Sequence, residues 1–138
     1  MRKIKQLILT FILISTFISC AWFEQNENEK IVGSYSISQI DSQGTNVTRG
    51  VKESGGAYTI VIDSDVHSVG HFGKFIFAKQ RERFSSDTLT NYYIVDTIKN
   101  VSEKKGVYGP LTKIKFDSLV TKLKIPNAVF DINYPKNQ

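Results

Sequence analysis

The feature that most constrains this chain is an apolar segment near its N-terminus, which ends at the only cysteine of the sequence. Residues 1–5 contain three basic side chains, and residues 7–18 then form an apolar run broken only by hydroxyl side chains. A basic segment followed by such a run is typical of a secretory signal peptide, and the run is shorter than the roughly 20 apolar residues of a membrane span. We therefore expect residues 1–19 to be an export signal, which leaves 119 of the 138 residues for the mature chain.

The single cysteine, Cys20, limits how the mature chain can be stabilised. No intramolecular disulfide can form, and no cluster of thiolates can hold a metal. The 119 residues that remain are enough for one domain with one modest core. We therefore expect a single domain that its apolar side chains hold together.

The net charge of the mature chain is small. The formal charge of +5 includes Arg2, Lys3 and Lys5 of the leader, so that +2 remains after its removal. The other bases alternate with acids, as in the Arg81-Glu82-Arg83 segment. Nucleic-acid binding requires a concentrated basic face, so we exclude that class of function.

The residues around Cys20 indicate a lipid anchor. Phe17-Ile18-Ser19-Cys20 resembles the lipobox of bacterial lipoproteins, in which a bulky apolar, a variable and a small residue precede the cysteine. The resemblance implies that the Cys20 thiol receives a diacylglycerol and that a peptidase then cuts between Ser19 and Cys20. Two other interpretations stay open: an uncleaved N-terminal anchor, or ordinary secretion with a thiol that carries no lipid.

The same resemblance bears on location. In two-membrane bacteria, an Asp directly after the cysteine holds a lipoprotein at the inner membrane. This chain has Ala21 at that position, so it resembles lipoproteins that are sorted to the outer membrane. We expect a domain outside the cytoplasm, in the cell envelope, that is lipid-anchored to the outer membrane or the cell membrane. Residues 20–30 would be the lipidated cysteine and a polar tether, and residues 31–138 a single β-rich domain.

Alternation of apolar and polar residues predicts strands in most of this domain. We expect strands within 31–40, 57–63, 74–79, 92–95 and 129–134, and a short polar edge strand within 47–53. Residues 63–72 have a less regular pattern, and residues 80–90 and 99–106 have the composition of loops.

One helix is predicted near the C-terminus. Thr112 is a suitable N-cap, apolar residues recur at helical spacing from Phe116 to Leu123, and Pro126 ends the segment. The fold class we expect is α+β: a small antiparallel sheet with one C-terminal helix packed on it.

Three segments carry a resemblance to a known family: residues 75–80, residues 91–96, and residues 107–112 with the helix that contains Phe116. Their order and spacing resemble a family of small bacterial lipoproteins classed as a domain of unknown function. The resemblance implies a common fold and a lipid anchor, and it supplies neither an activity nor a cofactor.

Four side chains close in sequence, Asp63, Asp65, His67 and His71, are of types that bind metals. On a strand the two histidines would lie about 13 Å apart, too far for one ion. Asp65 and His67 could share a strand face, but a third ligand is not evident. We therefore expect solvated turn residues here, with no metal and no cofactor.

The remaining candidates are a polar patch and a tyrosine-rich sheet. Lys79, Gln80 and Asp96 end two apolar strands and would be neighbours if those strands pair, either as a recognition patch or as a solvent-exposed ion pair. With Tyr92, Tyr93 and Tyr108 they form our candidate surface for a protein partner. The sequence contains no Gly-x-Ser-x-Gly motif, although a pair of converging carboxylates stays open. We therefore expect a non-catalytic interaction or protective domain, similar to an inhibitor or immunity protein, with a small cell-envelope hydrolase as the alternative.

Overall fold

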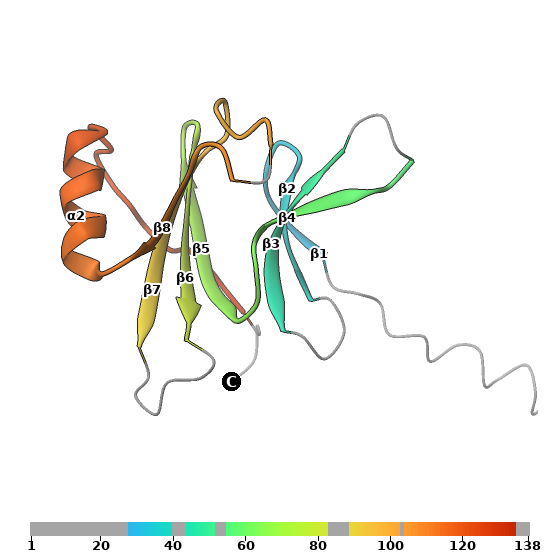
Figure 1. Ribbon diagram of the computed structural model, residues 1–138, viewed down its shortest axis with the longest axis horizontal. Helices are drawn as coiled ribbons and strands as arrows, with labels where there is room; N and C mark the ends of the chain where they lie inside the picture. Colours follow the sequence, from blue (N-terminus) through green and yellow to red (C-terminus); the bar gives the residue numbers. More distant parts are fainter. Residues whose placement is uncertain (1–27, 40–43, 52–54, 83–88, 103, 135–138) are drawn as a thin grey trace, which may run out of the picture.

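The computed structural model describes residues 28–39, 44–51, 55–82, 89–102 and 104–134, and in these ranges the chain forms two antiparallel sheets and one helix (Figure 1). The four-stranded sheet has the order β1-β2-β3-β4, and the five-stranded sheet has the order β8-β7-β6-β5-β9. The elements are β1 (Asn28–Val32), β2 (Tyr35–Gln39), β3 (Thr45–Gly50), β4 (Tyr58–Ile62), β5 (Val66–Phe72), β6 (Phe75–Arg81), β7 (Thr90–Asp96), β8 (Val107–Leu111), α2 (Lys113–Lys122) and β9 (Ile132–Asn133). The α+β class expected from the sequence is confirmed, with two sheets in place of one.

The five-stranded sheet is the middle of three layers, with α2 on one face and the four-stranded sheet on the other (Figure 1). Strands β6 and β7 at its centre are therefore covered on both sides. Ile76 and Ala78 point into the core between the sheets, whereas Phe77 points to the core under the helix. This alternation explains why the segment reads as an unbroken apolar run.

Aromatic rings fill the core under α2. Phe116 of the helix lies edge-on to Phe77 with ring centroids 6.3 Å apart, and 5.2 Å from the ring of Tyr92. Phe130, from the segment after the helix, contacts the same rings. Such ring pairs stabilise a core beyond the apolar area that they bury.

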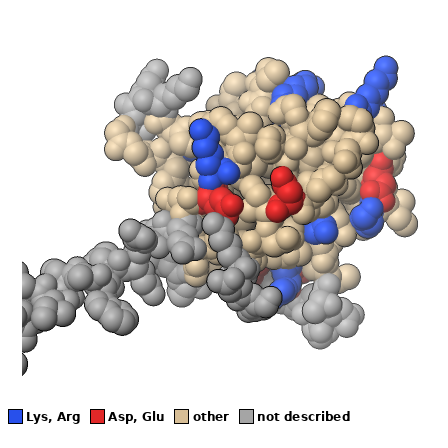
Figure 2. Space-filling model, turned by 180° about the vertical axis from the view of Figure 1, so that it is seen from behind, with Lys and Arg blue, Asp and Glu red and all other residues tan. Residues whose placement is uncertain are grey.

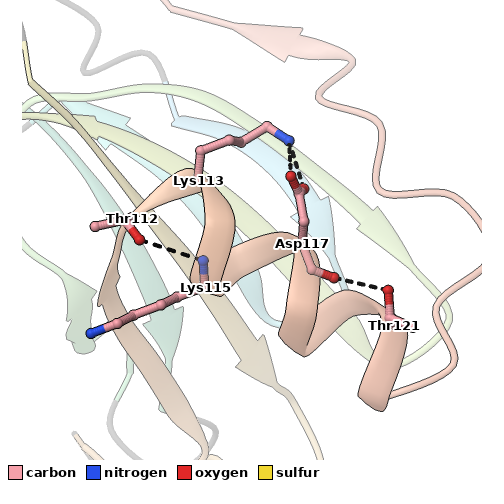
Figure 3. Close-up of polar contacts among 5 residues, drawn as sticks. All are labelled: Thr112, Lys113, Lys115, Asp117 and Thr121. Atoms are coloured by element: carbon pink, nitrogen blue, oxygen red, sulfur yellow. Dashed lines mark hydrogen bonds and ion pairs between the residues drawn. The ribbon is translucent and has the colours of Figure 1, made fainter.

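Local contacts define the ends of α2 as the sequence predicts (Figure 3). The Thr112 hydroxyl accepts a hydrogen bond from the Lys115 backbone N–H at 3.4 Å, and Lys122 lies in the last turn. On the exposed side, Lys113 forms an ion pair with Asp117 at 2.6 Å. The predicted cap and apolar face of this helix are confirmed.

The chain after the helix returns across the five-stranded sheet to add β9 beside β5. It passes so close to Gly70 that a Cβ there would overlap the Val129 carbonyl group. Gly70 therefore allows this close approach of two backbones. The terminal strand predicted within 129–134 exists but is only two residues long.

The strand predicted within 31–40 exists as two strands, because a turn divides these residues into the two arms of a hairpin. Strand β1 pairs with β2 through a turn at Gly33 and Ser34, in which Gly33 has a φ of 58° that favours glycine. Alternation continues through the turn and hides it. Strand β1 also begins at Asn28, inside the segment assigned to the tether.

The expectation of an edge strand within 47–53 is wrong, whereas the strand predicted within 57–63 exists as β4. Strand β3 is hydrogen-bonded on both sides and is not an edge strand, and its polar residues Asn46 and Thr48 are buried. Val61 and Ile62 are both buried, whereas Ile60 is 41% exposed. An irregular register opposite Val47 and Thr48 shifts the alternation at this point.

Residues 63–72 are more regular than their pattern indicates, since most of them form β5. Asp65 precedes the strand with a φ of 53°, so it does not share a strand face with His67. The export signal, Ser19, Cys20 and the tether up to residue 27 lie outside the described residues, and their assignment stays a prediction. In the described part of the chain, no helix has both the length and the apolar character to cross a membrane.

Candidate functional site

The patch expected from Lys79, Gln80 and Asp96 does not form. Strands β6 and β7 are antiparallel, so that Asp96 pairs with Phe75 at one end of the sheet while Gln80 pairs with Asn91 at the other. The expectation was wrong because the end of one strand lies beside the start of its antiparallel neighbour.

The three tyrosines of the candidate surface are half-buried. Tyr92 and Tyr108 pack in the core under α2. Tyr93 lies on the opposite face, where its ring covers Gly109 and its hydroxyl donates to Gln80 Oε1 at 2.9 Å. Burial raises the pKa of Tyr93, which keeps this hydroxyl a hydrogen-bond donor. These rings stabilise the fold, and they do not form one shared surface.

The candidate metal-binding side chains near His67 do not form a shared site either. Among the residues that the structure describes, no three His, Cys, Asp or Glu side chains lie close enough to share an ion. Burial, with Arg81 and Lys79 nearby, lowers the pKa of His67. This shift favours the neutral imidazole at neutral pH.

His67 does have a hydroxyl neighbour, which bears on the hydrolase alternative. Its Nδ1 lies 3.1 Å from the Ser68 hydroxyl, and that hydroxyl donates to Asn133 Oδ1 at 2.8 Å. Because the Ser68 proton points to Asn133, His67 is not placed to accept it as a general base. Ser68 is also buried, so the pair has a structural role.

A different site is formed by the loop between β7 and β8, and two buried polar residues hold it. Asp96 accepts from the backbone N–H groups of Ile98 and Lys99 and forms an ion pair with Lys74 at 3.1 Å. Asn100 donates to the carbonyl oxygens of Ser102 and Lys105 at 3.0 and 2.7 Å. Asp96 and Asn100 are 1% and 2% exposed, so the loop has a fixed polar centre.

This centre also joins the loop to the four-stranded sheet. The Tyr35 hydroxyl donates to Asn100 Oδ1 at 2.9 Å, and the Arg49 guanidinium donates to the Asn100 backbone carbonyl. Burial raises the pKa of Tyr35, against the opposing effect of Arg49. The loop conformation is therefore determined by residues on both sheets.

The loop presents apolar side chains at one end of the molecule. Ile98 and Val101 are 70% and 68% exposed. Thr97 donates to the Lys74 carbonyl oxygen, which joins the loop to the turn between β5 and β6, where Phe72 is 45% exposed. We call this end, the loop 97–106 with the β1–β2 and β5–β6 turns, the tip; it lies at the top of Figure 1.

A shallow hollow of about 400 Å³ lies beside the loop at the tip. Among the described residues its lining is mainly apolar or backbone, without acid, lysine or histidine: Val32, Gly33, Ser34, Tyr35 and Thr97. Lys99, Lys104 and Lys105 are exposed on the loop, and Lys74 lies on the neighbouring turn. The tip can therefore bind a partner surface that presents apolar groups next to negative charges, and this complementarity can select one partner over others.

The sequence pattern does not reveal this site, because residues 99–106 have the composition of an ordinary polar loop. Its only visible signal was Ile98 and Val101 between polar residues. On the face in Figure 2, basic and acidic groups are scattered over a largely uncharged surface, and some of them lie side by side.

The comparison with known protein families gives one match. Residues 32–131 match the family described as "Protein of unknown function (DUF3997)". No curated protein and no solved structure matches the chain.

Proposed function

The chain belongs to the DUF3997 family of proteins of unknown function, and from this premise we propose that it is a lipid-anchored, non-catalytic interaction domain of the bacterial cell envelope. Its partner is a protein that binds the tip. Binding there would let it act as a protective domain that blocks a harmful protein near the membrane.

One observation carries this proposal: Ile98 and Val101 are exposed on a loop that buried contacts hold in place. Exposed apolar side chains that cluster on a small protein mark contact sites. A loop whose conformation is already fixed loses little entropy when it binds, which increases affinity.

The charge around these side chains indicates the chemistry of the partner. Lys99, Lys104 and Lys105 are exposed on the same loop as the two apolar side chains, and Lys74, which pairs with Asp96, lies on the neighbouring turn. The complementary surface is an apolar pocket rimmed by Asp or Glu side chains, as on an acidic protein. An anionic lipid surface has the same charge but would require a larger apolar area to hold the tip, so we favour the protein.

The direction of β1 is consistent with this assignment. Strand β1 begins at Asn28, within the segment proposed as the tether, and ends at Val32, which lies with Thr97 at the tip. A domain that is tethered through Cys20 would therefore present the tip away from its attachment point. This orientation rests on the lipid anchor, which is itself part of the proposal.

Capture from solubilised membranes, with Ile98→Asp and Ile114→Asp as the two matched variants, tests the proposal. Ile114 is 82% exposed on α2, outside the tip, so the same substitution there controls for a new surface charge. We expect wild type and Ile114→Asp to retain the same acidic protein and Ile98→Asp to lose it. We also expect retention to weaken as salt is raised, because salt screens exposed charges.

Two results would contradict the proposal. One is capture that Ile98→Asp and Ile114→Asp affect equally. The other is flotation of the purified soluble domain with anionic vesicles in a manner that depends on Ile98, because the tip would then bind lipid and not a protein.

A further inference from the structure

The outer face of the four-stranded sheet contains a second hollow, which the proposed function does not use. Tyr35, Ile37 and Val47 point into the core between the sheets. Because side chains alternate along a strand, Ser36 and Ser38 point to the outer face. There they line a groove of about 400 Å³ with Ser34, Thr48, Gly50 and Tyr58. This volume lies in the range of small-molecule sites.

From its lining we infer that this groove is a binding site for an uncharged, hydroxyl-rich sugar chain. Its described lining consists of hydroxyl, amide, glycine and small apolar groups with one tyrosine, and contains no Asp, Glu, Lys, Arg or His. A charged ligand would lose water here without gaining an opposite charge from any of these described groups. A neutral ligand with many hydroxyl groups can both donate to and accept from such a lining.

The hydrogen bonds on the groove floor determine which of its hydroxyl groups can accept a hydrogen bond from a ligand. Thr48 Oγ1 lies 3.3 Å from the Ser36 carbonyl oxygen, to which it donates, and 3.0 Å from Ser38 Oγ. A hydroxyl has one proton, so Ser38 donates to Thr48 and keeps lone pairs to accept with. Ser38 is only 6% exposed, so a hydroxyl donor from a ligand would satisfy an acceptor that is otherwise buried.

Tyr58 and Gly50 give the groove its shape. These residues pair across β3 and β4, and Tyr58 is 53% exposed. Gly50 has no side chain to fill the space, and a Cβ there would meet only the Ser34 carbonyl oxygen at 3.7 Å. The apolar face of the Tyr58 ring can therefore stack on a sugar ring while its hydroxyl faces water.

Among the residues that the structure describes, Lys30 carries a positive charge near the groove but does not line it. Lys30 pairs with Ser36, so it stands on the same face of the sheet, on β1. The test therefore includes a charged sugar, so that its binding can be compared with that of neutral sugars.

Titration of the purified soluble domain with sugars, followed by amide chemical shifts, tests the inference. The probes are neutral tetrasaccharides of glucose and of N-acetylglucosamine, and a tetrasaccharide of uronic acid as the charged counterpart. We expect at least one neutral probe to shift amides of β2, β3 and β4, and the charged probe to bind more weakly.

Substitutions at the groove separate binding from folding. Gly50→Leu fills the space without backbone strain, and should weaken binding of the neutral sugar at least about tenfold, a change of about 1.4 kcal/mol. Tyr58→Ala, at an exposed ring, provides a second variant that should weaken binding while the fold is kept. His71→Leu adds the same side chain at an exposed position of the other sheet and should leave binding unchanged.

The inference is overturned if neither neutral sugar shifts any amide at about 10 mM, a concentration well above the dissociation constant of a usable site. It is also overturned if the charged sugar binds as well, or if Gly50→Leu and Tyr58→Ala bind as wild type does. Ile98→Asp should leave sugar binding unchanged, so failure of this inference and failure of the proposed function are distinguishable.

Discussion

The hydroxyl of Tyr35 donates a hydrogen bond to the side chain of Asn100 at 2.9 Å, across 65 residues of sequence and from one sheet to the loop of the other. Asn100 uses its amide on two backbone carbonyl groups of the same loop. The buried side chain of Asn100 therefore connects the exposed tip to the core, and it is the first place to test the account.

We expect Asn100→Ala to destabilise the protein by about 3 kcal/mol, because Tyr35 and two loop carbonyl groups lose their partner in a buried place. Tyr35→Phe removes one hydrogen bond and should cost about 1 kcal/mol. Urea unfolding of both variants measures the difference. Equal losses for the two variants would mean that Asn100 does not hold the loop.

The core under α2 gives a second prediction. Phe116 is 2% exposed and contacts three other rings, so Phe116→Ala should lower the free energy of unfolding by about 3–5 kcal/mol. Ile114→Ala, on the exposed side of the same helix, should change it by less than about 0.5 kcal/mol. Thermal or urea unfolding distinguishes the two, and a small effect at Phe116 would show that the helix is not packed on the sheet.

His67 gives a pH-dependent prediction. Its pKa is lowered in the folded state from the usual 6.5, first by burial and then by Arg81 and Lys79. Below about pH 6.5, His67 therefore binds a proton more readily in the unfolded chain than in the folded protein. The stability that is present above this pH is lost as the pH falls towards the folded-state pKa. We expect stability to fall as the pH is lowered through about 6.5, the ordinary histidine pKa, and to fall less in His67→Gln.

Histidine titration by NMR checks the shift directly, and His71→Gln is the control for the loss of an imidazole from the same strand. An identical pH dependence of stability in wild type and His67→Gln would contradict the prediction.

The lipid anchor is tested at Cys20. We expect Cys20→Ser to abolish acylation, since the serine hydroxyl cannot replace the acceptor thiol, and to stop cleavage by the lipoprotein peptidase. The domain should still fold, because the described core begins at Ile31. Labelling with a fatty-acid analogue should mark wild type only; an unlabelled wild type with Met1 as its N-terminus would identify an uncleaved anchor.

The parts of the fold that were predictable are those that leave a local pattern. Residues 75–78 read as a central strand because β6 is buried on both faces, and Thr112 with Phe116 predicted the start and the buried side of α2. Both signals act within a few residues of chain.

The parts that were not predictable depend on register and on distant partners. Asp96 was placed beside Gln80 because the sequence does not show which ends of two antiparallel strands meet. The turn at Gly33 was hidden by an alternation that continues through it. The tip was missed because Asn100 owes its position to Arg49 and Tyr35, which lie 51 and 65 residues away.

The most direct test of the central claim is photo-crosslinking in living cells with a photoreactive residue in place of Ile98. The claim is that the tip binds a protein of the envelope, so we expect position 98 to form a crosslink to one acidic protein. The same residue in place of Ile114, which is more exposed, should form none. Equal crosslinking from both positions, or none from position 98 in a correctly anchored and folded protein, would contradict the account.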